Sequence, residues 1–270
     1  MISLGQAHER RRKRREALED LGRLMKERRS IMLVHYSCES FYDRPNGSSA
    51  RITSIAVRAF ATGQTTSFSI HQMAEREGIA PDQIAQRYDE LEKQMLKEFS
   101  AYAKQHQDKS WVHWNMRDVN YGFPAIAHRS RVLGCTPSMP PEDKLFDLAR
   151  TLYRLFGPRY APHPRLKNVV GMNHITDLDM LDGKQEAEAF ERGEYVKLHL
   201  STLRKVDIVA NILERVEDGR LKTAAPLMEQ YGSPVAVIAA FLQEHPLAIT
   251  LLAIIGVVGS IVTIIGALQR

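Results

Sequence analysis

The sequence predicts an α/β fold, a mixed sheet flanked by helices, followed by one C-terminal transmembrane helix. Short apolar runs rich in β-branched residues alternate with longer segments whose apolar residues recur every three or four positions. A single stretch, Pro246 to Leu268, runs for 23 residues without a charge. The 270 residues are 44% hydrophobic and 26% charged, which is typical of a folded protein with one large or two small domains.

Residues 1–30 predict a basic, helical N-terminal arm. They hold ten Lys and Arg against five Asp and Glu, so they carry the whole net charge of +5. Leu18, Leu21 and Leu24 lie along one stripe of a helix expected from Ala17 to Arg28. Because the rest of the chain is neutral, the pI of 9.2 does not indicate a domain that coats nucleic acid.

The run from Arg10 to Arg15 has three interpretations. It could contact anionic lipid, or bind nucleic-acid phosphates. It could equally form a solvated helix face whose charges pair with the glutamates around it, Glu9, Glu16 and Glu19.

A domain over residues 31–216 begins with three strands. "SIMLVHY", "ITSIAVRAF" and "TTSFSIH" are separated by turn-forming Pro-Asn-Gly and Ala-Thr-Gly-Gln segments, which predicts an antiparallel meander. Residues 79–106 read as a helix with Pro81 and Asp82 at its start. "SWVHW", residues 110–114, is the fourth predicted strand.

The second half of the chain reads as helical. Helices are expected over residues 119–132 and 143–156, before a proline-rich loop, "GPRYAPHPRL". Further helical segments lead to a long helix from Val196 to Val216, and residues 217–245 predict a linker with a short helix.

The segment from Pro246 to Leu268 predicts a membrane span. At about 1.5 Å per residue, a helix of this length covers roughly 34 Å, enough for the hydrocarbon core of a bilayer. No apolar region follows the basic run at the N-terminus, so no cleavable signal peptide is indicated. We therefore expect a single-pass tail anchor in the cell inner membrane, with the N-terminal domain cytosolic.

The two cysteines, Cys38 and Cys135, form no CxxC pair. Their number and spacing argue against a disulfide scaffold and against a cysteine zinc site, and they fit a reducing compartment.

Polar residues follow two of the predicted strands. Glu39 lies just past the first strand, and Asn115 and Asp118 lie just past the fourth. Asp207 lies at the edge of the apolar stripe of the long helix, about 40° from Leu203 at 100° per residue. In this order the chain resembles the DnaQ-like (DEDD) 3′–5′ exonucleases of the ribonuclease H-like fold, over roughly Ile31 to Arg215.

The resemblance implies that Glu39, Asp118 and Asp207 are catalytic residues and ligands of divalent metal, Mg²⁺ or Mn²⁺. Two such ions need several carboxylates converging from different elements. The match is partial, because Ser37 stands where the family has its first Asp. Thr202 and Leu203 stand where the family has its His or Tyr base. The metal site is therefore expected to be degenerate.

Five residues are candidates for binding a ligand: Ser37, Trp114, Asn115, Arg204 and Lys205. Aromatic side chains near the strand ends could stack on the bases of a single strand, although core packing is an equal explanation. Basic side chains beside Asp207 could meet phosphates, or neutralise the acids.

These observations predict a membrane-anchored, nuclease-like protein that recognises nucleic acid or a nucleotide, with a defence-type effector as a hypothesis from architecture alone. An active metal-dependent 3′–5′ exonuclease is the first alternative. A structural or partner-binding membrane protein is the second. The sequence leaves the oligomeric state open.

Overall fold

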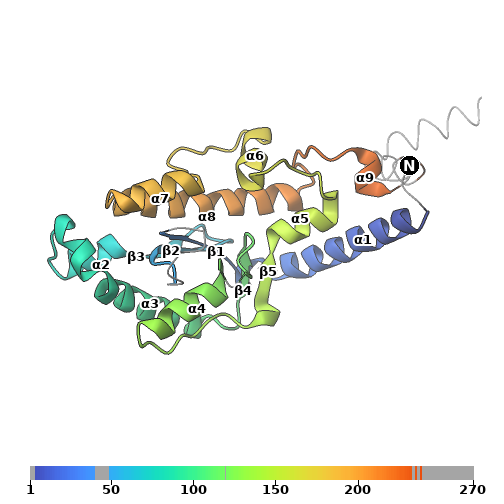
Figure 1. The fold of residues 1–270 in the computed structure, drawn as a ribbon. Coiled ribbons are helices and arrows are strands. Elements are labelled where there is room, and N and C mark those ends of the chain that lie inside the picture. The colour runs from blue at the N-terminus through green and yellow to red at the C-terminus, as the bar shows by residue number, and fades with distance from the viewer. Residues whose placement is uncertain (1–3, 40–48, 119, 233–234, 236–237, 239–270) are drawn as a thin grey trace, which may run out of the picture.

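The structure, a computed structural model, describes residues 4–39, 49–118, 120–232, 235 and 238. It contains a five-stranded mixed sheet flanked by helices (Figure 1). The strands are β1 (Ile31–Cys38), β2 (Ile52–Ala59), β3 (Thr65–Ser69), β4 (Ser110–His113) and β5 (Leu145–Asp147). The α/β class and the first four strands are as the sequence predicts.

The strand order is β3-β2-β1-β4-β5. Strands β1, β2 and β3 are antiparallel neighbours, which confirms the predicted meander. Strands β1, β4 and β5 are parallel to one another. This order and these directions are consistent with a ribonuclease H-like fold, and they bring the carboxyl ends of β1, β4 and β5 to one edge of the sheet.

Strand β5 is the main departure from the predicted elements. The sequence predicted one helix over residues 143–156, whereas the structure has a 3₁₀ turn (Glu142–Lys144), β5, and then α5 (Leu148–Phe156). Three residues pair with β4, from Trp111 opposite Leu145 to His113 opposite Asp147. Asp147 then ends the strand and caps α5, because its side chain accepts a hydrogen bond from the Arg150 backbone.

Helix α2 (Ile70–Arg76) was not predicted, and it begins where the sequence predicted the end of the third strand. The other helices are α1 (Leu4–Lys26), α3 (Tyr88–Gln105), α4 (Phe123–Val132), α6 (Arg165–Met172), α7 (Gly183–Glu191), α8 (Tyr195–Glu217) and α9 (Leu227–Tyr231). They follow predicted segments with shifted ends, and α1 begins at Leu4 rather than at Ala17. The predicted helix over residues 79–106 starts as a 3₁₀ helix (Pro81–Arg87) before α3. Helix α4 begins at Phe123, so the segment after β4 is a loop rather than a helix start.

Two cores lie on opposite faces of the sheet. Helices α2, α3 and α4 cover one face, and α1, α5 and α8 cover the other (Figure 1). Along β1, Met32, Val34 and Tyr36 belong to the first core, whereas Ile31 and Leu33 belong to the second. Since side chains alternate along a strand, His35 and Ser37 also point to the α8 face.

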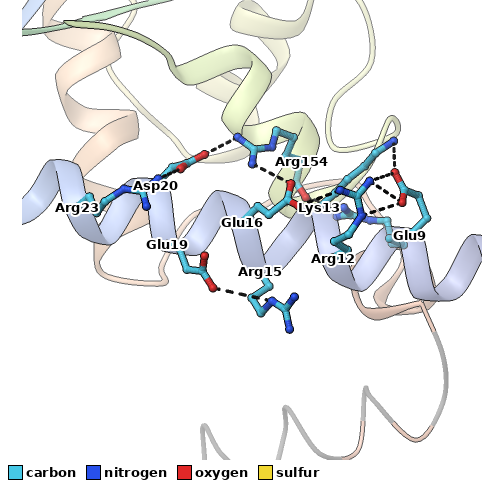
Figure 2. A network of polar contacts seen from close by, with 10 residues as sticks. Glu9, Arg12, Lys13, Arg15, Glu16, Glu19, Asp20, Arg23 and Arg154 are labelled. Atoms are coloured by element: carbon cyan, nitrogen blue, oxygen red, sulfur yellow. Dashed lines mark hydrogen bonds and ion pairs between the residues drawn. The ribbon is translucent and has the colours of Figure 1, made fainter. Parts of the chain in front are cut away.

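Most side chains of the basic run of α1 form ion pairs or hydrogen bonds within the protein. Arg12 pairs with Glu9 at 2.7 Å and with Glu16 at 3.0 Å, and Arg15 lies 3.8 Å from Glu19 (Figure 2). The structure thus shows the paired helix face that was one of the three interpretations of this run.

Ion pairs also join helix α1 to α5. Arg154 of α5 pairs with Asp20 at 2.7 Å and with Glu16 at 3.5 Å (Figure 2). The arm predicted for residues 1–30 therefore packs on the domain, where Ala17, Leu21 and Leu24 enter the second core.

In the part of the chain that the structure describes, no helix has the length and apolarity required to cross a bilayer. The span predicted from Pro246 to Leu268 lies outside the described residues.

We expect Asp147→Ala to lower the free energy of unfolding by about 1 kcal/mol, the usual cost of losing an N-cap. The loss arises because the Asp147 carboxylate accepts hydrogen bonds from the backbone of both Asn115 and Arg150, each at 3.2 Å. Denaturant titration of both chains would measure it. The control is Asp143→Ala, an exposed acid of the preceding turn, which should change stability by less than about 0.5 kcal/mol. Equal effects of the two substitutions would contradict the capping role.

Candidate functional site

A buried polar network occupies the carboxyl end of β1 on its α8 side. The Ser37 hydroxyl donates to Glu186 Oε1 of α7 at 2.7 Å, and Thr202 Oγ1 of α8 donates to Ser37 Oγ at 2.8 Å. Ser54 of β2 lies 2.5 Å from the Thr202 hydroxyl, and Ser201 donates to Glu186 at 3.2 Å. The network therefore ties together two strands and two helices.

A lysine provides the positive charge of this network. Lys205 Nζ lies 2.7 Å from Glu186 Oε1, and both side chains are buried. A buried ion pair of this kind is stabilised by further hydrogen bonds, and Ser37 and Ser201 supply two to Glu186 Oε1. Glu186 Oε2 has no hydrogen-bond partner within the described residues. Lys205, predicted to contact a ligand, instead neutralises a carboxylate that the sequence analysis did not single out.

His35 lies beside this charge. Its side chain is buried, and burial together with the Lys205 ammonium holds its pKa well below the usual range. The imidazole is therefore neutral at physiological pH, and a second positive charge next to Lys205 is avoided.

The three predicted acids occupy three different environments. Asp207 of α8 pairs with Arg58 of β2 at 3.1 Å. Asp118 is exposed in the loop after β4, where it accepts a hydrogen bond from the Asn120 backbone at 2.8 Å. Glu39 follows β1, and its backbone N–H donates to the Arg51 carbonyl at 2.8 Å.

The described residues do not fit a two-metal centre. No group of three or more His, Cys, Asp or Glu within them is placed to hold a metal ion. At the end of β1 the acceptor Glu186 is already paired with Lys205, and Ser37 supplies a hydroxyl rather than a charged ligand. The positions of Glu39, Asp118 and Asp207 as metal ligands remain predictions from the resemblance.

The loop after β4 is held in an unusual backbone conformation. Asn115 has a φ of +54°, which a side-chain-bearing residue rarely adopts. Gly122 has a φ of +139°, and a Cβ atom there would lie 2.2 Å from the Met116 carbonyl. Its N–H donates to Tyr36 Oη at 2.9 Å, so the loop closes on itself and is fixed to β1.

The same loop depends on a neutral histidine. His113 Nδ1 accepts a hydrogen bond from the Met116 backbone at 3.0 Å. Burial lowers the pKa of His113 to about 4, with Asp147 opposing this effect and Arg117 adding to it. The loop therefore keeps its acceptor over the physiological pH range.

A cavity of about 660 Å³ opens where this loop meets α5 and the proline-rich loop. Three arginines line it, Arg117, Arg150 and Arg165. Three aromatic residues line it as well, Trp114, Tyr153 and Tyr160. Asn115, Asp118 and Asp147 complete the polar wall. Three of the predicted site residues, Trp114, Asn115 and Asp118, thus lie around one cavity of a size typical for a small ligand.

Several donors in this cavity wall have no hydrogen-bond partner within the described residues. They are the Tyr160 hydroxyl, Arg117 Nε and Arg165 Nε. Burial raises the pKa of Tyr160 to about 12, so its hydroxyl keeps its proton. Because buried donors are normally satisfied, this set indicates that the cavity suits a ligand rich in acceptors.

Arg165 is held over aromatic rings. Its guanidinium carbon lies 5.3 Å from the centre of the Tyr160 ring and 5.9 Å from that of Tyr153. Tyr153 is 41% exposed, so its ring remains accessible for stacking. Trp114, in contrast, is 9% exposed and packs mainly in the second core.

A second cavity, of about 450 Å³, adjoins the first along the edge of β5. Arg117, Asp147 and Arg150 line both. Arg204, a predicted ligand-binding residue, lies apart from these cavities, and its Nε donates to the Leu178 carbonyl at 2.8 Å.

Comparison of the chain with protein-family models, curated proteins and solved structures finds no significant match.

Sequence reasoning missed Glu186, Tyr160 and Arg165. A glutamate within a helical segment is usually solvent-exposed, and no local pattern marks Glu186 as buried. Tyr160 and Arg165 lie in the segment that the sequence predicted only as a proline-rich loop. Only the position of β5 shows that this loop reaches the carboxyl edge of the sheet.

We expect Lys205→Met to lower the free energy of unfolding by about 3–5 kcal/mol, because it leaves the Glu186 carboxylate buried without a counter-charge. Combining it with Glu186→Gln should recover part of this loss. Denaturant titration would measure both chains. The control is Lys197→Met, an exposed lysine of the same helix, which should change stability by less than about 0.5 kcal/mol. A Lys205→Met chain as stable as the control would rule out the buried pair.

Acid should destabilise the fold between about pH 6.5 and pH 4. Burial lowers the pKa of both His113 and His199 to about 4, so the unfolded chain binds protons that the folded chain rejects. Their contribution is present above the unfolded pKa near 6.5, and it falls by about 1.4 kcal/mol per pH unit for each residue as the pH decreases toward 4.

Thermal unfolding followed across this range would measure the slope. His199→Gln should flatten it, whereas His128→Gln, at an exposed position of α4, should leave it unchanged. An identical slope in all three chains would show that the buried imidazoles do not control the pH dependence.

Proposed function

We propose that this chain is a nuclease-like protein that recognises a nucleotide or a single strand of nucleic acid in the cavity at the carboxyl ends of β4 and β5. The observation that carries the proposal is the wall of that cavity, which three arginines and an accessible tyrosine ring line together. Guanidinium groups form strong charge-assisted hydrogen bonds with phosphate, and tyrosine rings stack on bases. Recognition of a nucleotide uses both interactions, the first with its phosphate and the second with its base.

The location of the cavity supports the same proposal. In α/β sheets with parallel strands, ligands bind in the crevice outside the carboxyl ends of the strands. The parallel set β1, β4 and β5 ends at this edge. Asn115, in the loop after β4, and Asp147, the last residue of β5, both line the cavity.

The likeness to DnaQ-like exonucleases is part of the proposal. Ser37 and Thr202 stand where that family places its first Asp and its base, and their hydroxyls lie 2.8 Å apart. Contact between the two positions supports the alignment with the family. The two hydroxyls in place of charged groups, together with the Lys205–Glu186 pair, favour recognition of a ligand over its cleavage. We further propose that the residues 246–268 anchor the protein in the inner membrane, which their 23 uncharged positions support.

The full-length protein in detergent should bind a fluorescent 12-nucleotide DNA or RNA single strand, or a nucleoside triphosphate, with an affinity that falls as salt rises. Arg150→Ala combined with Arg165→Ala should weaken binding at least tenfold, because each removes charge-assisted hydrogen bonds to phosphate. Fluorescence anisotropy at fixed ionic strength would report the change.

Arg192→Ala, an exposed arginine beyond the end of α7, is the matched control and should alter affinity less than twofold. Binding that is lost equally in the control would point to non-specific charge. No binding of any of these probes would reject the proposal and leave the partner-binding alternative. Rapid Mg²⁺- or Mn²⁺-dependent cleavage, abolished by Asp118→Ala, would instead establish the nuclease.

A further inference from the structure

Helix α9 is fastened to the N-terminal half of α1. Arg10 Nε donates to the Glu229 carbonyl at 2.7 Å. The Arg14 guanidinium lies 4.5 Å from the centre of the Tyr231 ring. Gly232, with a φ of +80°, approaches α1 so closely that a Cβ atom there would lie 2.9 Å from the Ala7 carbonyl. The last continuous part of the described chain is therefore fixed beside the basic run.

This attachment sets where the chain leaves the domain. Residues 233–245 alone separate Gly232 from the uncharged segment that starts at Pro246. In any conformation, a segment of that length spans at most about 45 Å. If residues 246–268 lie in a bilayer, the N-terminal half of α1 is held near its surface at a high effective concentration.

The surface beside this exit carries positive charge. Residues 4–19 contain six Lys and Arg and three Glu, a net charge of +3. Arg10 and Arg14 face α9 and α5, where they bond to backbone carbonyls. The remaining cations of the run are exposed, Arg11, Arg12, Lys13 and Arg15, and they exceed the three glutamates by one charge. Arg12 and Lys13 pair with those glutamates at 2.7–3.3 Å, and Arg15 lies 3.8 Å from Glu19. Leu18, at helical spacing from Arg11 and Arg15, is 48% exposed.

Apolar side chains are exposed on the neighbouring part of the chain. Leu227 and Met228 of α9 are 56% and 42% exposed. Val235 and Ile238, the next described residues after Gly232, are 74% and 60% exposed. A basic helix face beside exposed apolar side chains is the composition of surfaces that lie in the headgroup region of a membrane.

We infer that this face, formed by the N-terminal half of α1 together with α9, lies against an anionic lipid bilayer and orients the domain on it. The inference rests on the proposed anchoring through residues 246–268, and it adds a second contact that depends on lipid charge. It assigns Arg11 and Arg15, which lie beside Leu18, to lipid headgroups rather than to nucleic acid, whereas Arg12 and Lys13 pair with Glu9 and Glu16 along the helix.

The experiment uses full-length protein in nanodiscs that contain a headgroup-linked quencher and either neutral or anionic lipid. A fluorophore is placed at Leu18→Cys in one chain and at Lys104→Cys of α3 in another. Labelling is selective because the native Cys38 and Cys135 are buried. We expect at least twofold stronger quenching at position 18 in anionic than in neutral discs, and no quenching at position 104 in either.

Charge reversal supplies the matched controls. In the Leu18→Cys chain, Arg11→Glu with Arg15→Glu should reduce quenching to the level seen in neutral discs. Lys97→Glu with Lys104→Glu, the same charge change on α3, should leave quenching as it was. High salt should act like the first pair, because it screens the attraction.

The outcomes separate the inference from the anchoring on which it rests. Protein that enters the discs with no quenching at position 18, or with equal quenching in neutral and anionic discs, overturns the inference and leaves the anchor. Protein that does not enter discs of either composition overturns both.

Discussion

The buried pair of Lys205 and Glu186 is the interaction on which the arrangement at the end of β1 depends. It joins α8 to α7, and Glu186 in turn accepts the Ser37 hydroxyl of β1. Neither charge has access to water, so each requires the other and both require the surrounding hydroxyls. The positions of β1, α7 and α8 at this site therefore depend on one another, and a substitution of either charged residue would disturb all three.

The cavity of about 660 Å³ lies beside β4 and β5, apart from this buried pair. Lys205, Ser37 and Ser201 all bond to Glu186 Oε1, whereas Glu186 Oε2 and both ring nitrogens of His35 have no hydrogen-bond partner within the described residues. One strand further along the sheet, the loop after β4 and the segment after α5 leave arginine and tyrosine donors without partners among the described residues. These donors line the cavity beside β4 and β5, and the proposed binding site therefore lies at that part of the carboxyl edge.

The sequence predicted the first four strands because their apolar runs are long enough to show a pattern. Strand β5 has only three residues and directly precedes an amphipathic helix, so its pattern merges with that of the helix. Pairing with β4, a contact remote in sequence, is what extends these residues. The same limit applies to the candidate site. Trp114, Asn115 and Asp118 were singled out because they lie at or just after the end of a strand that the sequence pattern predicts. Glu186 and Tyr160 were missed because their environment is created only by tertiary packing.

The short edge strands have a consequence for assembly. The two outer strands of the sheet, β3 and β5, have five and three residues, and the longer strands β1 and β2 lie inside. An exposed strand can recruit a strand from another molecule, and a brief edge offers few backbone groups for such pairing. Fibril-like stacking through this sheet is therefore disfavoured at high local concentration.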